Sequence, residues 1–392
     1  MPEVIVVGGG ATGAGVAREL ATHGVEVTLL ERGSLAAGAS GAMHGVLHSG
    51  ARYAVADPTS ARECIAENRR LRRLAPDCVS EVGGLFVSLP ADPDGYIDEL
   101  AAACRDCDIP VERLSGETAR EREPQLAETV EAALAVPDGT VDPVRLVAAN
   151  ALAAERAGAS INQETAVTDL LVESGRVVGV ETAAGKRRAD CVVNAAGAWA
   201  GDLAAMADID LQMAPARGVM TVTREQYADR VLNRCRPKTS GDILVPHGGH
   251  SILGTTDVAV EDPDDYPREE WEVELLFEEL SPVVPALSEA TVSHSYWGVR
   301  PLYEPAPDAE DPTALSRGFS LLDHAEDGRP GLVSIVGGKL TTYRAMAEAT
   351  ADLVCDRLAV STDGSTATPL PDAAEATDRF GLEDLLAATR PA

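Results

Sequence analysis

The sequence predicts an α/β fold in which a Rossmann-type parallel sheet is joined to a second domain built on a mixed sheet. The first observation is a run of β-branched residues, Val4 to Val7, which leads directly into glycines and then into a helical pattern. The same succession of strand, small-residue turn and helix recurs at 191–199 and at 331–344. Short strand patterns fill 210–315, interrupted by a helical stretch at 267–280, and these predict the mixed sheet.

The glycines after the first strand have the spacing of a dinucleotide-binding turn. Gly8, Gly10 and Gly13 match G-x-G-x-x-G at the point where the helix must begin. Gly8 allows the tight turn, Gly10 lets the backbone approach a pyrophosphate, and Gly13 lets the helix pack on the strand. A turn without a ligand is the alternative, but a second strand at 25–30 ends in Glu31, where the fingerprint expects an acidic residue for the ribose hydroxyls. We therefore expect a dinucleotide site.

Two further small-residue turns indicate which dinucleotide binds. The strand from Cys191 runs into 195–197, and the strand from Leu332 runs into 337–338. Backbone that approaches a long cofactor at several points favours FAD over NAD, so an NAD-dependent dehydrogenase is the disfavoured alternative. The helix after the third turn could stabilise negative charge on a reduced flavin with its N-terminus.

The composition excludes several classes of partner. The 392 residues include 63 acidic and 33 basic side chains, for a net charge of −30, which would repel nucleic acid and anionic membranes. Only three of the basic residues are lysines. This balance is typical of proteins from a salt-rich cytoplasm, where self-repulsion is screened, so we expect folding and activity to require high salt. An ordinary acidic protein is the alternative.

The sequence also predicts the cellular location of the protein and the redox state of its cysteines. It contains no apolar run of membrane-spanning length, and its first strand begins so early that we expect no signal peptide and a cytoplasmic protein. The seven cysteines form an odd, scattered set, as expected for reduced thiols. Cys104 and Cys107 form a C-x-x-C pair, but no second pair completes a metal or cluster site. We therefore expect this pair to pack in the core, and we expect no bound metal.

A glycine- and serine-rich loop at 32–53 is the richest stretch in reactive side chains. It is too rich in small residues for a regular element, yet it contains His44, His48, Arg52 and Tyr53. A loop of this kind beside a nucleotide-binding fold is a suitable place for a ring system and a substrate.

The order of these patterns predicts two domains, one bound to the cofactor and one covering the substrate. The predicted cofactor domain is discontinuous and comprises 1–75, 140–208 and 316–360. The predicted substrate or cap domain comprises 76–139 and 209–315. The polar, small-residue-rich segment 361–392 is predicted as a linker or tail. The segment 137–143, with two prolines and Gly139, is predicted as a turn.

Seven motifs carry a family resemblance. They are the glycine strand, His44–Val55, Val136–Pro143, Ile252–Asp257, Gly298–Leu302, Ser316–Gly318 and Gly337–Arg344. In this order they resemble the FAD-dependent glycerol-3-phosphate dehydrogenases, specifically the catalytic A subunit of the anaerobic, multi-subunit enzyme. The resemblance spans about residues 2–360.

The resemblance implies a glutathione-reductase-like flavoprotein of the amino-acid-oxidase type, with an FAD-binding Rossmann domain and a mixed-sheet substrate domain. It implies oxidation of sn-glycerol 3-phosphate to dihydroxyacetone phosphate by hydride transfer from C2 to N5 of FAD. It also implies companion flavin and iron–sulfur subunits that pass electrons to quinone, with contact at the inner face of the cell membrane only through these partners. The catalytic chain of this family carries a further cysteine-rich C-terminal domain that this sequence lacks, and both truncation and a paralogue without that domain are open.

A phosphate dianion needs fixed cations in an otherwise acidic protein. The residues that match the family's substrate site are Arg52, Arg300, Arg317 and Lys339. We assign Arg317, Lys339 and Arg52 mainly to phosphate, and Arg300 to the reacting alcohol, where it would stabilise alkoxide character. Tyr53 could add a hydroxyl to either group. For any single arginine, a structural or surface ion pair is the alternative.

The general base is expected in the histidine loop. In the homologous aerobic dehydrogenases a histidine occupies the segment that corresponds to Arg217–Met220, and this sequence has none there. His48 is the catalytic candidate because imidazole titrates in the useful range and its loop should border the flavin. A structural or flavin hydrogen bond is the alternative role for His48. His44 is expected to contact the cofactor.

The remaining cofactor contacts follow from the three turns and the loop. The predicted FAD-binding residues are Gly8, Gly10, Ala11, Thr12, Gly13, Glu31, Arg32, Ser40, His44, Gly45, Leu47, Val167, Ala196, Gly197, Trp199, Gly337, Gly338, Lys339, Leu340 and Thr341.

Two other functions stay open at this point. Another flavin oxidoreductase of the same fold could act on a 2-hydroxy acid or an amino acid, but it would need a carboxylate clamp and no dianion site. A non-catalytic flavoprotein that docks partners and relays electrons is the other alternative.

Overall fold

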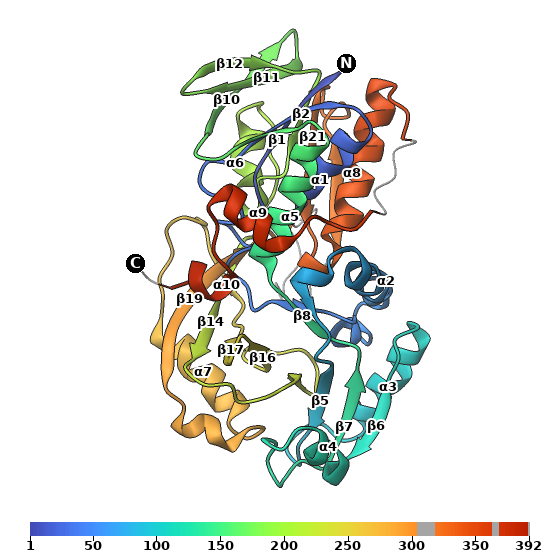
Figure 1. Ribbon diagram of the computed structural model, residues 1–392, viewed down its shortest axis with the longest axis vertical. Coiled ribbons are helices and arrows are strands. Elements are labelled where there is room, and N and C mark those ends of the chain that lie inside the picture. Colours follow the sequence, from blue (N-terminus) through green and yellow to red (C-terminus); the bar gives the residue numbers. More distant parts are fainter. Residues whose placement is uncertain (304–317, 363–367, 391–392) are drawn as a thin grey trace.

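A parallel sheet forms the centre of the first domain (Figure 1, upper half). The computed structural model describes residues 1–303, 318–362 and 368–390 of the chain. In the middle of the sheet lies β1 (Glu3–Val7), which pairs in parallel with β13 (Cys191–Asn194) and β2 (Glu26–Leu30). The sheet continues through β21 (Leu332–Gly337) and β9 (Ser160–Asn162), both parallel, and ends in the antiparallel strand β20 (Phe319–Asp323). Because the parallel strands end at one edge, the turns after β1, β13 and β21 meet there.

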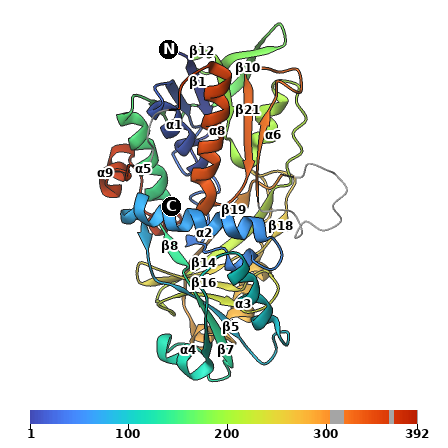
Figure 2. The ribbon, with the colours of Figure 1, turned by 90° about the vertical axis from the view of Figure 1, so that its right-hand side faces the viewer.

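Both faces of this sheet are buried, as its continuous run of β-branched residues predicts. Val4 and Val6 face the helical layer, whereas Ile5 and Val7 face the opposite side. The helical layer, seen beside the sheet in Figure 2, consists of α1 (Ala11–Thr22), α5 (Pro143–Arg156) and α8 (Tyr343–Leu358). The opposite face carries α6 (Ala200–Ala205) and a three-stranded antiparallel sheet of β10 (Val167–Glu173), β11 (Arg176–Thr182) and β12 (Gly185–Arg188).

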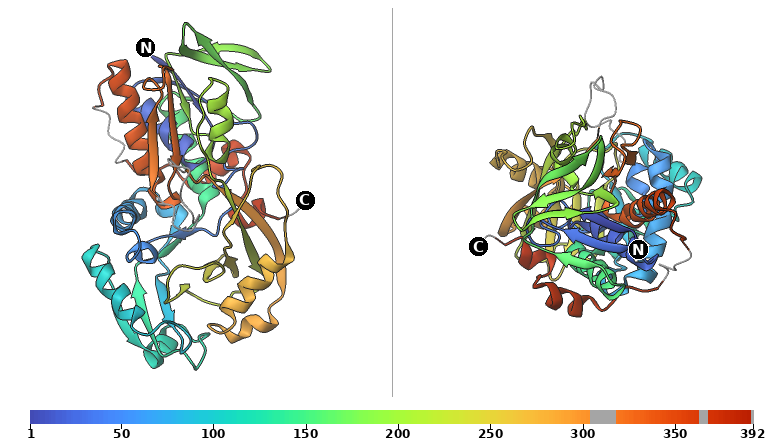
Figure 3. Two further views of the ribbon diagram at one scale, coloured as in Figure 1. Left: turned by 180° about the vertical axis from the view of Figure 1, so that it is seen from behind. Right: turned by 90° about the horizontal axis from the view of Figure 1, so that it is seen from above.

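The second domain is built on one large mixed sheet. Its strand β14 (Ala216–Thr223) is buried along its whole length and pairs antiparallel with β19 (Val292–Arg300) and β17 (His250–Gly254). The other strands are β5 (Gly84–Ser88), β6 (Glu112–Ser115), β7 (Ala132–Val136), β15 (Val231–Arg234), β16 (Ile243–His247) and β18 (Val258–Ala259). The helices of this domain are α3 (Tyr96–Asp106), α4 (Gly116–Arg122) and α7 (Glu270–Leu280). Figure 3 shows the two lobes from behind and from above.

Short elements join the two domains. Strand β8 (Gly139–Val141) pairs with β3 (Val46–Leu47) and with β4 (Val79–Ser80), so the segment predicted as a turn contains a strand between two partners. Asp142 then begins α5, since its Oδ1 accepts hydrogen bonds from the backbone N–H groups of Val144 and Arg145. The long helix α2 (Pro58–Leu74) lies at the same junction in Figure 2. Single 3₁₀ turns occupy Ala51–Tyr53, Pro76–Cys78, Gly197–Trp199, Pro285–Glu289 and Leu340–Thr342.

The last segment of the chain packs onto both domains. Within the region predicted as a linker or tail lie α9 (Ala373–Phe380) and α10 (Leu385–Ala388). Helix α9 packs on α5, and the Leu385 side chain, which is 0% exposed, joins the apolar cluster that contains Val46 and the β14–β17 strands. The backbone N–H of Leu385 donates to Asp142 Oδ2 at 3.1 Å. The segment therefore braces the loop that carries the histidines, because a few apolar side chains within its polar sequence are buried.

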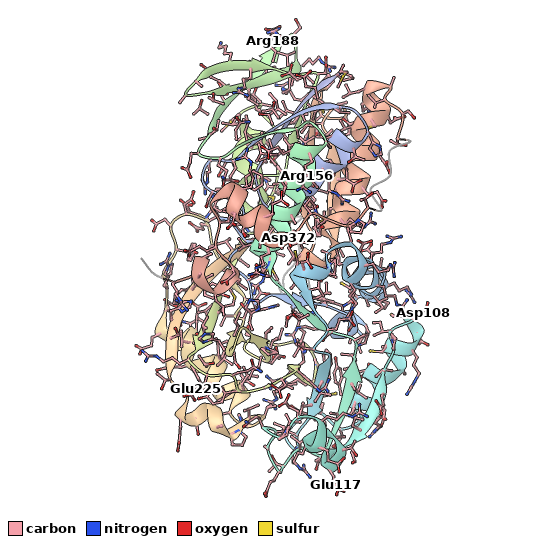
Figure 4. All side chains as sticks on the ribbon, in the orientation of Figure 1. Asp108, Glu117, Arg156, Arg188, Glu225 and Asp372 are labelled. Carbon is pink, nitrogen blue, oxygen red and sulfur yellow. The ribbon has the colours of Figure 1, made fainter. Side chains whose placement is uncertain are left out.

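Charged side chains cover the outside of both lobes. Figure 4 labels six exposed ones, namely Asp108, Glu117, Arg156, Arg188, Glu225 and Asp372. All seven cysteines are buried free thiols, and Cys104 and Cys107 lie in one apolar cluster, which confirms their packing role. In the part of the chain that the structure describes, no helix is both long and apolar enough to cross a membrane.

We call the segment that contains α9 and α10 the C-terminal brace. Its contribution to stability can be tested by removing the buried side chain of Leu385. Leu385→Ala should lower the free energy of unfolding by about 2–5 kcal/mol, because it leaves a cavity between the two domains. The measurement is chemical unfolding at one fixed salt concentration. The control is Glu383→Ala, an exposed position of the same segment, which should change stability by no more than about 0.5 kcal/mol. Equal stability of the two variants would contradict the bracing role.

Candidate active site

Backbone turns at the edge of the parallel sheet form the first part of the site. Gly8, directly after β1, has φ +112°, and a Cβ there would lie 2.4 Å from the carbonyl oxygen of Ala195. A Cβ at Gly13 would lie 1.9 Å from the carbonyl oxygen of Gly8, so α1 packs directly on the turn. Helix α1 begins at Ala11, and the residue before it, Gly10, has no side chain that could cap the helix. The positive end of the helix therefore faces the cavity that these residues line.

A cavity of about 330 Å³ extends from this turn and contains most of the predicted cofactor residues in its wall. These are Gly8, Gly10, Ala11, Thr12, Glu31, Arg32, Ser40, Val167, Ala196, Gly197 and Trp199. Glu31 also shapes the turn, since its carboxylate accepts from the N–H of Gly9 at 2.6 Å and of Gly33 at 2.8 Å. Gly13 lies outside the wall and contributes through the packing of α1. We call this space the cofactor cavity.

A second cavity of about 200 Å³ adjoins the first and lies between the two domains. The two cavities share Ala11, Thr12, Ala39, Ser40 and Pro301. The cofactor domain contributes His44, His48, Tyr53, Gly337, Gly338, Lys339, Leu340 and Thr341 to its wall. The other domain contributes Gly218, Met220, Thr255, Gly298 and Arg300. We call this space the reaction cavity, because it brings the predicted reactive residues together.

The residues of the cofactor cavity fit a dinucleotide. The start of α1 offers backbone N–H donors and a positive helix end to a pyrophosphate. Gly197 has φ +62° and open space where a Cβ would stand, so a ligand can approach the backbone closely there. The hydroxyl of Ser40 accepts from the N–H of Ala11 at 2.9 Å and fixes the loop against the helix. A bound dinucleotide would thus extend from the first turn toward the histidine loop.

His44 and His48 stand edge to face in the reaction cavity, with ring centroids 5.9 Å apart. Nδ1 of His44 accepts from the backbone N–H of Val46 at 3.2 Å, which places the proton of the neutral ring on Nε2. Burial, together with the charges of Arg300 and Arg52, lowers the pKa of His44 to about 3. Its ring is therefore neutral at pH 7.

The pKa of His48 is also lowered, to well below its ordinary value of 6.5. Burial is the main cause, and the neighbouring His44, Arg52 and Lys339 add to it. The ring lies 5.5 Å from that of Tyr53, measured between centroids. A neutral imidazole in this position can accept a proton at pH 7.

Arg300 and Lys339 enter the reaction cavity from different domains. Arg300 ends β19, and its Nη2 donates to Thr255 Oγ1 at 2.9 Å, which holds the guanidinium in place. Lys339 follows the glycine turn after β21. Its Nζ donates to Ser60 Oγ at 3.0 Å and lies 4.7 Å from the centroid of the Tyr53 ring. The two cations are thus positioned from opposite sides of the domain boundary.

Arg52 is held in a different way. Its Nη2 forms an ion pair with Asp242 Oδ1 at 2.6 Å and donates to the carbonyl oxygen of Thr239 at 3.1 Å. Both charged side chains are buried, and Arg52 is not among the residues that line the reaction cavity. The positive charge of Arg52 lowers the pKa of both His44 and His48. A direct contact of Arg52 with the substrate phosphate stays a prediction.

Other predicted site residues have supporting positions. Gly45, with φ +74°, turns the histidine loop, and Leu47 is buried; neither lies in the wall of the two cavities. Thr341 Oγ1 accepts from the backbone N–H of His48 at 3.1 Å and ties this loop to the third turn. Arg317 lies outside the residues that the structure describes.

Sequence reasoning missed the residues that support the site from behind. Asp242, which pairs with Arg52, stands in no recognisable motif. Arg217 begins the segment Arg217–Met220, and its Nε donates to Glu272 Oε2 at 3.1 Å within the core of the second domain. Thr255 lies in one of the family motifs, and that motif is the signal that could have identified it.

Comparisons with known proteins agree with this geometry. Residues 3–344 match the family model described as "FAD dependent oxidoreductase". The A1 subunit of the anaerobic glycerol-3-phosphate dehydrogenase of the haloarchaeon Haloferax volcanii is 53% identical, over 97% of this chain and 69% of the relative. The A subunit of the anaerobic glycerol-3-phosphate dehydrogenase of Haemophilus influenzae is 43% identical, over 95% of this chain and 68% of the relative.

A solved structure has the same fold. The glycerol-3-phosphate dehydrogenase of Bacillus halodurans, complexed with FAD, superimposes with a TM-score of 0.70, at 24% identity, over 97% of this chain and 70% of that one. The predicted α/β fold of the glutathione-reductase-like, amino-acid-oxidase type is confirmed, and so are FAD as the cofactor and the family resemblance. The chain belongs to the FAD-dependent oxidoreductases and, within them, to the catalytic A subunits of the anaerobic glycerol-3-phosphate dehydrogenases.

Proposed function

We propose that the chain oxidises sn-glycerol 3-phosphate to dihydroxyacetone phosphate. The observation that carries this proposal is the reaction cavity, in which the neutral His48 lies with two cations, Arg300 and Lys339, next to the cofactor cavity. The relatives in Haloferax volcanii and Haemophilus influenzae carry the name of this dehydrogenase. The fold alone would not decide the substrate, because one fold supports many reactions.

The substrate phosphate is assigned to Lys339, and the hydroxyl of Tyr53 is a further candidate to donate to it. A dianion gains most from a cation fixed by the protein, and Lys339 is fixed by Ser60 and by the face of the Tyr53 ring. Arg52 and Arg317 are the other phosphate candidates from the sequence. Arg300 is assigned to the C2 oxygen, where a guanidinium stabilises the negative charge that develops as the proton leaves.

His48 is assigned as the general base that removes the proton of the C2 hydroxyl. Its lowered pKa keeps the ring neutral and ready to accept that proton at pH 7. FAD, when bound, supplies the acceptor for the hydride that leaves C2. His48 thus takes the proton while the C2–O bond becomes a carbonyl, and Arg300 holds the oxygen throughout.

The electrons taken up by FAD must pass to an acceptor, and partner subunits are the acceptor that we propose. The relatives are subunits of a multi-subunit enzyme by name, and partner subunits are proposed for this chain on that ground. We propose companion flavin and iron–sulfur subunits, which pass the electrons to quinone, and peripheral placement at the inner face of the membrane through them. Oxygen as the acceptor would make the chain an oxidase instead.

The proposed reaction can be tested by anaerobic mixing of the FAD-loaded protein, in molar salt, with sn-glycerol 3-phosphate. Rapid bleaching of the oxidised flavin absorbance is expected, because hydride transfer needs no external acceptor. Glycerol, lactate and an amino acid serve as controls and should leave the spectrum oxidised. Bleaching by lactate or the amino acid would favour the 2-hydroxy acid or amino acid alternative. An oxidised spectrum with every substrate would favour the electron-relay alternative.

The phosphate role of Lys339 predicts a specific defect. Lys339→Met should raise the apparent Kd for sn-glycerol 3-phosphate roughly 10- to 100-fold, because the phosphate loses a charge-assisted contact. The Kd is measured from the substrate dependence of flavin reduction in protein with full FAD content. The matched control is Lys186→Met, which removes an exposed lysine on β12 and should leave the Kd unchanged. An unchanged Kd in Lys339→Met would refute the assignment.

The role of His48 predicts a pH profile. At saturating substrate, the rate constant of flavin reduction should be constant above pH 6.5 and fall only below it, since protonation inactivates a base and this pKa lies well below 6.5. His48→Gln should lower the rate constant roughly 100-fold or more across the whole range. A wild-type inflection above pH 6.5, or a His48→Gln variant of normal rate, would count against His48 as the base.

A further inference from the structure

Three side chains interlock at the edge of the cofactor cavity. Arg32 Nη2 lies 2.8 Å from Asp264 Oδ1, and Arg32 Nη1 lies 3.2 Å from Asp264 Oδ2. The indole Nε1–H of Trp199 donates to the same Asp264 Oδ2 at 2.9 Å. The guanidinium carbon of Arg32 lies 4.1 Å from the centroid of the Trp199 ring. Each residue thus contacts both of the others, and we call this cluster the clasp.

The clasp joins segments that are far apart in the chain. Arg32 follows β2, and Trp199 lies in the turn after β13, both at the carboxyl edge of the parallel sheet. Asp264 comes from the other domain, between β18 and α7. Asp262 Oδ1 accepts from the backbone N–H of Asp264 at 2.8 Å and shapes its loop. The clasp is therefore a contact of the second domain with the cofactor domain.

The clasp lies at the mouth of the cofactor cavity. All three residues belong to the wall of that cavity. The side chains of Arg32 and Asp264 are nevertheless 50% and 56% exposed, so the same groups face the cavity and the solvent. A wall residue that is half exposed stands where the cavity opens. Asp264 was not predicted from the sequence as a site residue.

An isolated ion pair on the surface contributes little to stability. The clasp differs from such a pair in its geometry. The pair is bidentate, the carboxylate accepts a further N–H from the indole, and the guanidinium stacks on the same indole. The hydrogen bonds from Arg32 and Trp199 lower the pKa of Asp264, so the carboxylate stays ionised at neutral pH. Each contact restricts the other two groups, which reduces the entropy lost in forming the cluster.

We propose that Asp264 closes the mouth of the cofactor cavity over bound FAD and slows its release. This inference rests on FAD as the cofactor and on no assignment within the reaction cavity. Asp264 acts through Arg32 and Trp199, which it fixes over the opening, and is in that sense a positioning residue. The second domain thereby helps to retain a cofactor that the first domain binds.

The proposal is tested by the rate at which FAD leaves the protein. The FAD-loaded protein is diluted in molar salt without substrate, and release is followed by the rise of flavin fluorescence. Asp264→Asn keeps the shape of the side chain and removes its charge, so the dissociation rate constant should rise roughly three- to tenfold. The matched control is Asp265→Asn, the same change at the next, exposed residue of the loop, and its rate should equal that of wild type.

A second variant separates the clasp from a folding defect. Trp199→Phe keeps an aromatic ring beside Arg32 and removes the N–H donor, so it should accelerate release by a smaller factor. In the double variant with Asp264→Asn the two effects should be less than multiplicative, because Asp264 and Trp199 act through the same cluster with Arg32. Wild-type release rates in Asp264→Asn, or fully multiplicative effects, would overturn the proposal. Since no substrate is present, failure of the proposed dehydrogenase reaction would not affect this outcome.

Discussion

The close approach of three backbone turns at the carboxyl edge of the parallel sheet is the constraint on which the site depends. Neither Gly8 nor Gly13 could carry a methyl group without meeting a backbone oxygen, at 2.4 Å and 1.9 Å respectively. At the third turn, Gly338 has φ +75°, a conformation that other residues rarely adopt, and a Cβ there would lie 2.4 Å from Met346 Sδ in the first turn of α8. These contacts fix the helix ends and, with them, the position of Lys339. The cofactor cavity and the reaction cavity are consequences of this packing.

A second constraint is the strongly acidic composition, because positive charge at the site must be supported by the fold. Two buried arginines are each compensated by a nearby carboxylate, Arg52 by Asp242 at 2.6 Å and Arg217 by Glu272 at 3.1 Å. Removing one partner from such a pair would leave an uncompensated buried charge, which typically costs about 3–5 kcal/mol. The carboxylates behind the site are therefore as necessary to it as the cations that face the ligand.

The sequence predicts the parts of the site that depend on local spacing. The glycine turn, the buried strands and the histidine loop could be identified because each lies within a short segment whose pattern has a direct physical cause. The pairing of Arg52 with Asp242 and of Arg32 with Asp264 joins residues 190 and 232 positions apart, and no local pattern encodes such contacts. The brace was missed for a related reason, since Leu385 is one apolar side chain within a polar segment and its burial depends on Val46 and the β14–β17 strands.

We propose that one cavity holds the phosphate on Lys339 and the reacting carbon at His48. A crystal structure of the FAD-loaded protein with dihydroxyacetone phosphate tests this claim most directly. We expect a phosphate oxygen within about 3.5 Å of Lys339 Nζ and the carbonyl oxygen within hydrogen-bond reach of Arg300, with C2 facing the flavin. A phosphate bound away from Lys339, or a ligand bound with its carbonyl remote from both His48 and Arg300, would contradict it.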